Sequence, residues 1–212
     1  MSISDRKQRQ KEEVRTSILD TAWDLVVTEG WHSFSIRKVA DKIEYSVPVI
    51  YSHFDNKDAI LLEFNRKGFG LLVEALAAAK AAGKTPPDEI RAMGRAYWRF
   101  AFANKEYYQL MFGLGIPSCE AVQKIPAMSD LNQVITASIV AMVPAGQTPP
   151  FDPFLKYQSF WSMLHGLVSI NMTAVDNLAG KTGHHEGLAE AVLEDVLCSF
   201  IRGIESAVHP KS

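Results

Sequence analysis

The sequence lacks the features that define several protein classes. Its two cysteines, Cys119 and Cys198, lie far apart and outside any C-x-x-C pair, so neither a disulfide framework nor a zinc site is indicated. The two longest uncharged runs are unsuited to crossing a bilayer, because prolines and glycine break residues 131–151 and polar side chains interrupt residues 157–175. No apolar stretch follows the N-terminal charges, so we expect no signal peptide. These absences predict a soluble protein of the reducing cytoplasm with no membrane partner.

A large net charge is also absent. The 212 residues carry 22 Lys and Arg against 24 Asp and Glu, so the bulk charge of −2 indicates no nucleic-acid partner. The distribution of charge is uneven, because residues 5–11 hold four cations against one anion, whereas residues 68–212 hold 11 cations against 13 anions. A basic segment ahead of a near-neutral body fits a polyanion contact at one end of the molecule, although a solvated, disordered tail has the same composition.

Helical periodicity runs through the whole chain, without an alternating strand pattern, an internal repeat or a low-complexity tract. Apolar residues recur at the i, i+3, i+4 and i+7 spacing of an amphipathic helix, and glycines and prolines separate the periodic segments. We expect an all-α protein of about nine helices, with a three-helix N-terminal head and a larger C-terminal helical body. The predicted helices are one ending near residues 29–30, a second after Ser35, a short third within 46–53, a long one capped within 55–58, and others at 88–104, 106–113, 127–143, 154–178 and the C-terminus.

The segment 46–53 carries more apolar side chains than a short helix can bury. Val47, Pro48 and Val49 are consecutive, and neighbours in a helix point about 100° apart, so these three cannot all face the core. Ile50 and Phe54 have the i, i+4 spacing of an inward pair. The other side chains then point outward, and exposed valines suit van der Waals contact with thymine methyl groups in a DNA major groove. These outward residues are Val47, Pro48, Val49, Tyr51, Ser52 and His53.

Three helices within 55 residues, the last two joined by a tight turn, are typical of a helix-turn-helix. The stretches SIRKVADKI (35–43) and PVIYSHFDNK (48–57) resemble the DNA-binding head of the TetR (tetracycline repressor) family, and the likeness covers about residues 14–65. Glu44 stands where the family has a turn glycine, so we expect a residue with a side chain to adopt a left-handed backbone conformation there.

The resemblance also implies roles for individual residues in DNA binding. Tyr51 and His53 match a pair that contacts phosphates, and Lys57 matches a lysine at the start of the fourth helix, where free N–H groups and the helix dipole favour a phosphate. Arg37 matches a position used on base edges or phosphate, and Val47, Pro48 and Val49 occupy the base-facing positions.

The second half of the chain resembles the C-terminal domain of a TetR subgroup named for a Trp…His-Gly (WHG) signature. The signature stands here as Trp161, His165 and Gly166, and the stretch EYYQLMF (106–112) is also similar. Trp161 and His165 share one helical face, and Gly166 permits close approach of another backbone. The same residues fit an ordinary core with His165 hydrogen-bonded, and the sequence does not separate the two interpretations.

Aromatic and methionine side chains are dense enough in this half to line a cavity for a small, largely apolar or aromatic ligand, although such side chains also build plain cores. Polar side chains that would orient the ligand are His165, Asn171 and Tyr108. Arg91, Arg95 and Arg99 fit a solvated stripe near Asp88 better than an anion site. The predicted ligand residues are Trp98, Phe102, Tyr108, Met111, Phe112, Trp161, His165 and Asn171.

These observations predict a DNA-binding transcription regulator in three parts. Residues 1–56 form the helix-turn-helix domain with a basic arm at 1–11, residues 57–85 a connecting helix, and residues 86–212 a ligand-binding and dimerisation domain. The apolar last two helices favour a homodimer built as a four-helix bundle, which lets two recognition helices bind half-sites one turn apart on a palindromic operator.

We expect a repressor that a small ligand releases, with no cofactor, metal or catalytic residue. The nearest reactive cluster, His184-His185-Glu186, lacks the H-E-x-x-H spacing of a zinc-binding helix. The alternatives are a ligand-dependent activator of the same family, a helical small-molecule-binding protein without a DNA role, and a helical enzyme.

Overall fold

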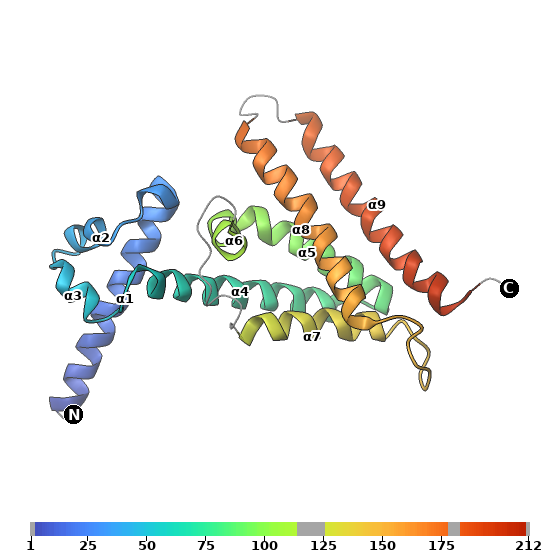
Figure 1. The fold of residues 1–212 in the computed structure, drawn as a ribbon, viewed down its shortest axis with the longest axis horizontal. Coiled ribbons are helices and arrows are strands. Elements are labelled where there is room, and N and C mark those ends of the chain that lie inside the picture. The colour runs from blue at the N-terminus through green and yellow to red at the C-terminus, as the bar shows by residue number, and fades with distance from the viewer. Residues whose placement is uncertain (1–2, 114–125, 178–182, 211–212) are drawn as a thin grey trace. The chain divides into compact units, whose positions relative to one another are not determined.

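The computed structural model describes residues 3–113, 126–177 and 183–210 and, within these ranges, the side chains of all but residues 3 and 173–186. The described residues form nine α-helices and one 3-10 turn, with no strand among them, so the all-α prediction is confirmed (Figure 1). They divide into two compact units. The first takes Met1–Lys67 and Glu106–Val122, and the second takes Gly68–Lys105 and Gln123–Ser212.

The first unit contains the predicted three-helix head. The sequence predicts one apolar face on its first helix at Val14, Ile18, Ala22, Leu25 and Val26; the last four are buried, whereas Val14 is half-buried. Its elements are α1 (Ile3–Glu29), the 3-10 turn η1 (Trp31–Ser33), α2 (Ile36–Lys42), α3 (Val47–Tyr51), the first turns of α4 (Lys57–Ala82), and α6 (Lys105–Phe112).

The basic N-terminal segment is part of α1. The alternative of a disordered tail is therefore wrong for residues 3–11, which are helical as far as the first described residue. Lys, Arg, Gln and Glu have high helix propensity, so this polar segment extends the helix although it has no apolar face to signal it.

Side-chain caps fix where the head helices begin. Ser35 accepts a hydrogen bond from the backbone N–H of Lys38 at 3.2 Å, which confirms the predicted start of α2. At the start of α4 the side chain of Asn56 accepts from the N–H of Ala59 at 2.9 Å. The sequence pattern, a cap followed three residues on by a carboxylate, indicates Asp55 as the capping residue; this is wrong by one position, because the capping side chain is that of Asn56.

Aromatic contacts hold α6 in the first unit. The indole Nε1 of Trp31 donates a hydrogen bond to the carbonyl oxygen of Glu106 at 3.0 Å. The rings of Trp23 and Tyr107 stack with centroids 3.8 Å apart and an interplanar angle of 20°. Compactness thus groups α6 with the head, whereas the functional boundaries near residues 56 and 85 stay a prediction.

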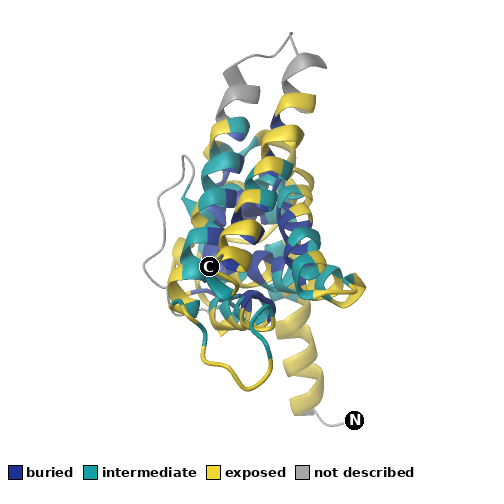
Figure 2. Ribbon diagram, turned by 90° about the vertical axis from the view of Figure 1, so that its right-hand side faces the viewer, coloured by how far each residue is buried: buried dark blue, intermediate teal, exposed yellow. Residues whose placement is uncertain are grey.

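The second unit is built around α5. This helix contacts α7, α8 and α9, and α8 also packs against α7 and α9. The sequence predicts a stripe on the last helix at Leu193, Val196, Leu197, Phe200, Ile201 and Ile204, and five of these six are buried while Val196 is half-buried. Figure 2 shows the described turns of α8 and α9 with buried positions on one side and exposed ones on the other. The helices are the later turns of α4, α5 (Pro86–Ala103), α7 (Pro126–Val140), α8 (Pro153–Asn177) and α9 (Gly183–Val208).

Two glycines behave differently in this unit. A Cβ atom on Gly94 would overlap the side chain of Leu197, so glycine lets α5 approach α9 closely. A Cβ atom on Gly166 would meet nothing within 4 Å. The close approach that the sequence suggested for Gly166 is therefore not made by any residue that the structure describes.

Candidate nucleic-acid interface and ligand-binding region

The turn between α2 and α3 adopts the left-handed conformation at Glu44. Its φ is 60°, as expected from the missing turn glycine. The N–H of Tyr45 donates to the carbonyl of Ala40 at 3.0 Å, and the N–H of Glu44 donates to the carbonyl of Asp41 at 3.4 Å. This pair of bonds is a Schellman motif, which satisfies the end of α2 and fixes the direction in which α3 leaves the turn.

Helix α3 is anchored by one buried face. Ile50 is fully buried and Phe54 nearly so, which confirms the predicted inward pair. The rest of the segment forms an outward face: Tyr51 is 48% exposed, Pro48 and Ser52 are exposed, and Val47, Val49 and His53 are half-buried.

The sequence did not identify Tyr45 as part of this surface. Its side chain is 45% exposed in the turn that precedes α3. An aromatic residue in a tight turn between two short helices has little core to enter, and this signal was available in the sequence.

Two polar side chains on the outward face have distinct environments. The hydroxyl of Ser52 donates to the carbonyl of Val49 at 2.7 Å, which leaves its oxygen as an acceptor. The Nδ1 atom of His53 is buried without a hydrogen-bond partner among the described residues. Burial lowers the pKa of His53, and the positive charges of Lys11 and Arg15 lower it further.

The predicted DNA-binding cations Lys57 and Arg37 differ in how they are held. The ammonium group of Lys57 donates to the carbonyl of Phe34 at 3.2 Å and lies 4.9 Å from the centre of the Phe34 ring. An ammonium group has three donors, so this anchoring positions the group without using all of them. Arg37 is exposed and forms no ion pair with a described residue, whereas the neighbouring Lys38 pairs with Glu29 at 2.9 Å.

In the second unit, the signature residues of α8 lie against each other. The rings of Trp161 and His165 stack with centroids 5.6 Å apart and an interplanar angle of 20°. The Nε2 atom of His165 lies 3.5 Å from the hydroxyl of Ser169, and burial lowers the pKa of His165. One turn further, the amide of Asn171 donates to the carbonyl of Leu167 at 2.8 Å.

The other predicted ligand residues fall into two groups. On α5, the rings of Trp98 and Phe102 lie 4.6 Å apart, and Phe102 is 38% exposed. On α6, which belongs to the first unit, Tyr108 and Met111 are buried, and the rings of Tyr108 and Phe112 lie 4.6 Å apart. The division of these residues between two units leaves a single shared pocket as a prediction.

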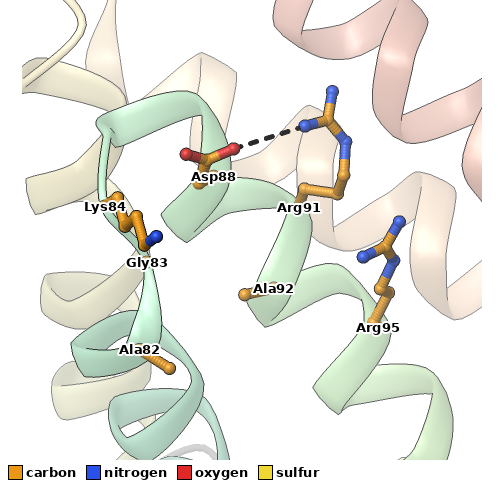
Figure 3. Close-up of a pocket in the computed structure, with 7 residues that line it drawn as sticks. All are labelled: Ala82, Gly83, Lys84, Asp88, Arg91, Ala92 and Arg95. Carbon is orange, nitrogen blue, oxygen red and sulfur yellow. Dashed lines mark ion pairs between the residues drawn. The ribbon is translucent and has the colours of Figure 1, made fainter.

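Two open clefts of the second unit lie away from those residues. The cleft between the end of α4 and the start of α5 has a volume of about 560 Å³ and is lined by Ala82, Gly83, Lys84, Asp88, Arg91, Ala92 and Arg95 (Figure 3). The other, of about 750 Å³, is lined by Pro86, Pro87, Ala141, Met142, Glu205, Ser206 and His209. None of the predicted ligand residues lines either cleft.

Ion pairs account for two arginines of the stripe on α5. A terminal nitrogen of Arg91 lies 3.6 Å from the carboxylate of Asp88, as Figure 3 shows. Arg95 binds Glu194 of α9 through two bonds of 2.6 and 2.8 Å, and this hydrogen bonding lowers the pKa of the Glu194 carboxyl. These pairs are exposed, so each contributes little to stability.

We also expect the described part of the chain to hold neither a metal site nor a membrane-spanning helix. Its His, Cys, Asp and Glu side chains form no group of three that could hold a metal ion. The side chains of His184, His185 and Glu186 lie outside those that the structure describes. No described helix combines the length and the apolar character needed to cross a membrane.

Comparison with known families agrees with both halves of the fold. Residues 18–64 match the family described as "Bacterial regulatory proteins, tetR family", and residues 90–196 match "Tetracyclin repressor-like, C-terminal domain". The chain belongs to the TetR family and is a DNA-binding transcription regulator. The WHG subgroup stays a prediction.

Individual relatives are distant. An uncharacterised HTH-type transcriptional regulator of Mycobacterium tuberculosis, Rv0681, is 23% identical over 90% of this chain and 81% of its own. The transcriptional regulator FadR of Bacillus subtilis, solved with stearoyl-CoA, is 16% identical with a TM-score of 0.60, over 93% of this chain and 99% of its own. AibR, solved with isovaleryl coenzyme A and operator DNA, is 18% identical with a TM-score of 0.57, over 84% of this chain and 95% of its own. At these identities the two structures establish the shared fold only.

Proposed function

We propose that this regulator is a cytoplasmic repressor that binds a palindromic operator as a homodimer and leaves it when a small molecule binds the second unit. The observation that supports the proposal most is the outward face of α3. It presents apolar and polar side chains together, while Ile50 and Phe54 anchor the opposite face in the core. An activator of the same family would use the same DNA interface, so the sign of regulation is tested separately.

Each residue of the proposed interface has a role that follows from its chemistry. Val47, Pro48 and Val49 present carbon atoms, which recognise thymine methyl groups in the major groove. Tyr51, Ser52 and His53 carry polar atoms toward the rim of the same face, where phosphates run. We assign Lys57 and Arg37 to phosphates of the DNA backbone as well. Lys57 is held at the start of α4, where a phosphate is favoured, and Arg37 is exposed.

The proposed dimer uses α8 and α9. Ile170 of α8 is 68% exposed and Leu188 of α9 is 63% exposed, which is unusual for large apolar side chains on one pair of helices. Gly166 lies one turn before Ile170 and has open space beside it, so a helix of a second copy can approach its backbone. Two such hairpins related by a two-fold axis form a four-helix bundle.

The proposed ligand is small and largely apolar and binds beside Trp98 and Phe102 of α5 and Trp161, His165 and Asn171 of α8. These two helices contact each other within the second unit. An acyl thioester of coenzyme A is the first class to test, because FadR and AibR were each solved with one. Addition of isovaleryl-CoA or stearoyl-CoA is expected to weaken operator binding, and free coenzyme A is not. If neither thioester has an effect, this ligand class is wrong, while the DNA interface stands.

The DNA interface is tested by selecting duplexes from a random pool with the full chain. We expect an inverted-repeat consensus. On the selected duplex, Tyr51→Phe removes one charge-assisted hydrogen bond per protomer, worth about 1.5–3 kcal/mol each, and the two losses per dimer weaken binding to every sequence by about a hundredfold or more. Val49→Ala changes which base is preferred at one position of each half-site. Val27→Ala is the matched control, since Val27 is an exposed valine elsewhere in the same unit. If Tyr51→Phe and Val49→Ala bind the selected duplex with the same affinity and the same base preference as Val27→Ala, the assignment of this face to DNA is refuted.

The dimer is tested by sedimentation velocity. Ile170→Asp places a charge on the proposed interface and is expected to yield monomers that bind the operator weakly. Ala137→Asp places the same charge on the exposed side of α7 and is expected to leave the dimer intact. Equal sedimentation of the two variants as dimers would place the interface elsewhere.

A further inference from the structure

The N-terminal turns of α1 form a helix that the core of the head does not use. Every residue from 4 to 13 is exposed, and Figure 2 shows these N-terminal turns in yellow. The first buried residue of α1 is Ile18. The segment extends past α3 in the first unit (Figure 1). Residues 4–13 include no apolar side chain, so the segment has nothing to insert into a bilayer or into an apolar protein groove. Four of the residues at positions 5–11 are cationic and one is anionic.

The angular positions of these cations around α1 determine which of them lie on the side that faces the core of the head. Successive residues turn about 100° around a helix, so positions 7, 11 and 18 lie within about 20° of one direction. Ile18 is fully buried in the head. Lys7 and Lys11 therefore continue the head-facing side of α1 beyond the point where the core ends, and both side chains are exposed there.

The end of α3 lies close to this stripe. Burial lowers the pKa of His53, Lys11 and Arg15 lower it further, and Glu12 raises it, so the charges at this end of α1 act on the ring from nearby, with two cations against one anion. Arg15 is fixed by an ion pair to Glu63 at 3.0 Å and by its position 4.8 Å from the centre of the Phe54 ring. A row of positive charge thus begins beside the proposed phosphate contact His53 and continues along α1.

We infer that Lys7 and Lys11 bind DNA phosphates that flank each half-site, so that the protein contacts a longer stretch of DNA than α3 alone can reach. The inference rests on the proposed function, because it needs the outward face of α3 to lie in the major groove. Charge complementarity and continuity with that face identify DNA as the partner of this helix. The contacts are to the backbone, so they add affinity without changing the preferred sequence.

The test uses the full chain and two duplexes with the same selected inverted repeat. The short duplex ends at the outer edge of each half-site, and the long duplex continues for about half a helical turn on both sides. Wild-type protein is expected to bind the long duplex at least tenfold more tightly. The double variant Lys7→Ala/Lys11→Ala is expected to bind both duplexes equally. Affinity is also measured at several salt concentrations, and the slope of log K against log salt concentration falls in magnitude by about 0.9 for each lost phosphate contact. The double variant loses four contacts per dimer, so on the long duplex its slope is expected to be smaller by about 3.6.

Two control variants separate this role from general electrostatics and from folding. Lys84→Ala/Arg202→Ala removes the same charge from exposed positions of the second unit and is expected to keep the preference for the long duplex. Lys7→Arg/Lys11→Arg is expected to restore that preference. Circular dichroism confirms that each variant is folded.

The outcomes distinguish this inference from the function on which it rests. If the wild type binds both duplexes equally, or if Lys7→Ala/Lys11→Ala keeps the preference for the long one, the N-terminal contact is refuted and the α3 interface stands. If the wild type binds no duplex, the proposed function and the inference fail together.

Discussion

Replacing Glu44 with glycine is expected to stabilise the protein. A residue with a Cβ atom in the left-handed conformation costs about 1–2 kcal/mol, and Glu44 occupies it with a φ of 60°. Glycine removes this strain, but it also increases the conformational entropy of the unfolded chain, which lowers the free energy of unfolding by about 0.5–1 kcal/mol. The Glu44 carboxylate forms no ion pair with a described residue, so the substitution removes no such bond. At the middle of each range the net gain is about 0.75 kcal/mol, which for a chain of this size raises Tm by about 2–3 °C.

The assay is thermal unfolding followed by circular dichroism, with Glu44→Ala as the matched control. Alanine also removes the charge but keeps the Cβ atom, so it is expected to leave Tm near the wild-type value. The bonds from Tyr45 to Ala40 and from residue 44 to Asp41 use backbone atoms, so operator affinity should stay within about twofold for both variants. A Tm for Glu44→Gly equal to or below that of Glu44→Ala would refute the reasoning.

Three further substitutions test packing and protonation. Trp31→Phe removes the donor to the Glu106 carbonyl and is expected to cost about 1 kcal/mol in thermal unfolding, with faster amide exchange in α6; unchanged exchange would contradict the proposed anchoring. Burial lowers the pKa of His165, so the unfolded state binds the proton more tightly, and the free energy of unfolding falls as pH drops below about 6.5. In urea denaturation His165→Gln should flatten this fall, and an unaltered slope would oppose the assignment. Ser138→Ala removes a buried hydroxyl that donates to Glu89 at 2.5 Å and is expected to cost about 1–2 kcal/mol by the same assay, whereas wild-type stability would mean that the bond contributes nothing.

The helices that were predictable have local signals. Ser35 caps α2, Ile50 and Phe54 have the spacing of an inward pair, and the stripe from Leu193 to Ile204 repeats over three turns of α9. In each case the residues that determine the structure lie within a few positions of one another. Glu44 belongs to the same group, because the missing glycine locates a left-handed residue in the turn.

The features that were not predictable depend on distant contacts. The grouping of α6 with the head depends on Trp31 and Glu106, which are 75 positions apart, and no local pattern encodes that bond. Gly94 and Gly166 both lie in helices, yet among the described residues packing requires a glycine at position 94 and not at position 166. The roles of the outward residues of α3 and of the aromatic residues of α5, α6 and α8 stay predictions, since exposure and stacking are compatible with more than one use.

The most direct test of the central claim is operator binding after uracil replaces thymine in each half-site. The change removes only the 5-methyl groups that face the major groove. If Val47 and Val49 contact these groups, uracil at one or two thymine positions should weaken binding of the wild type about tenfold. The Val49→Ala variant already lacks the valine side chain, so uracil at the position that Val49 contacts should weaken its binding only slightly. Equal affinity of the wild type for thymine and uracil duplexes at every position would contradict the account.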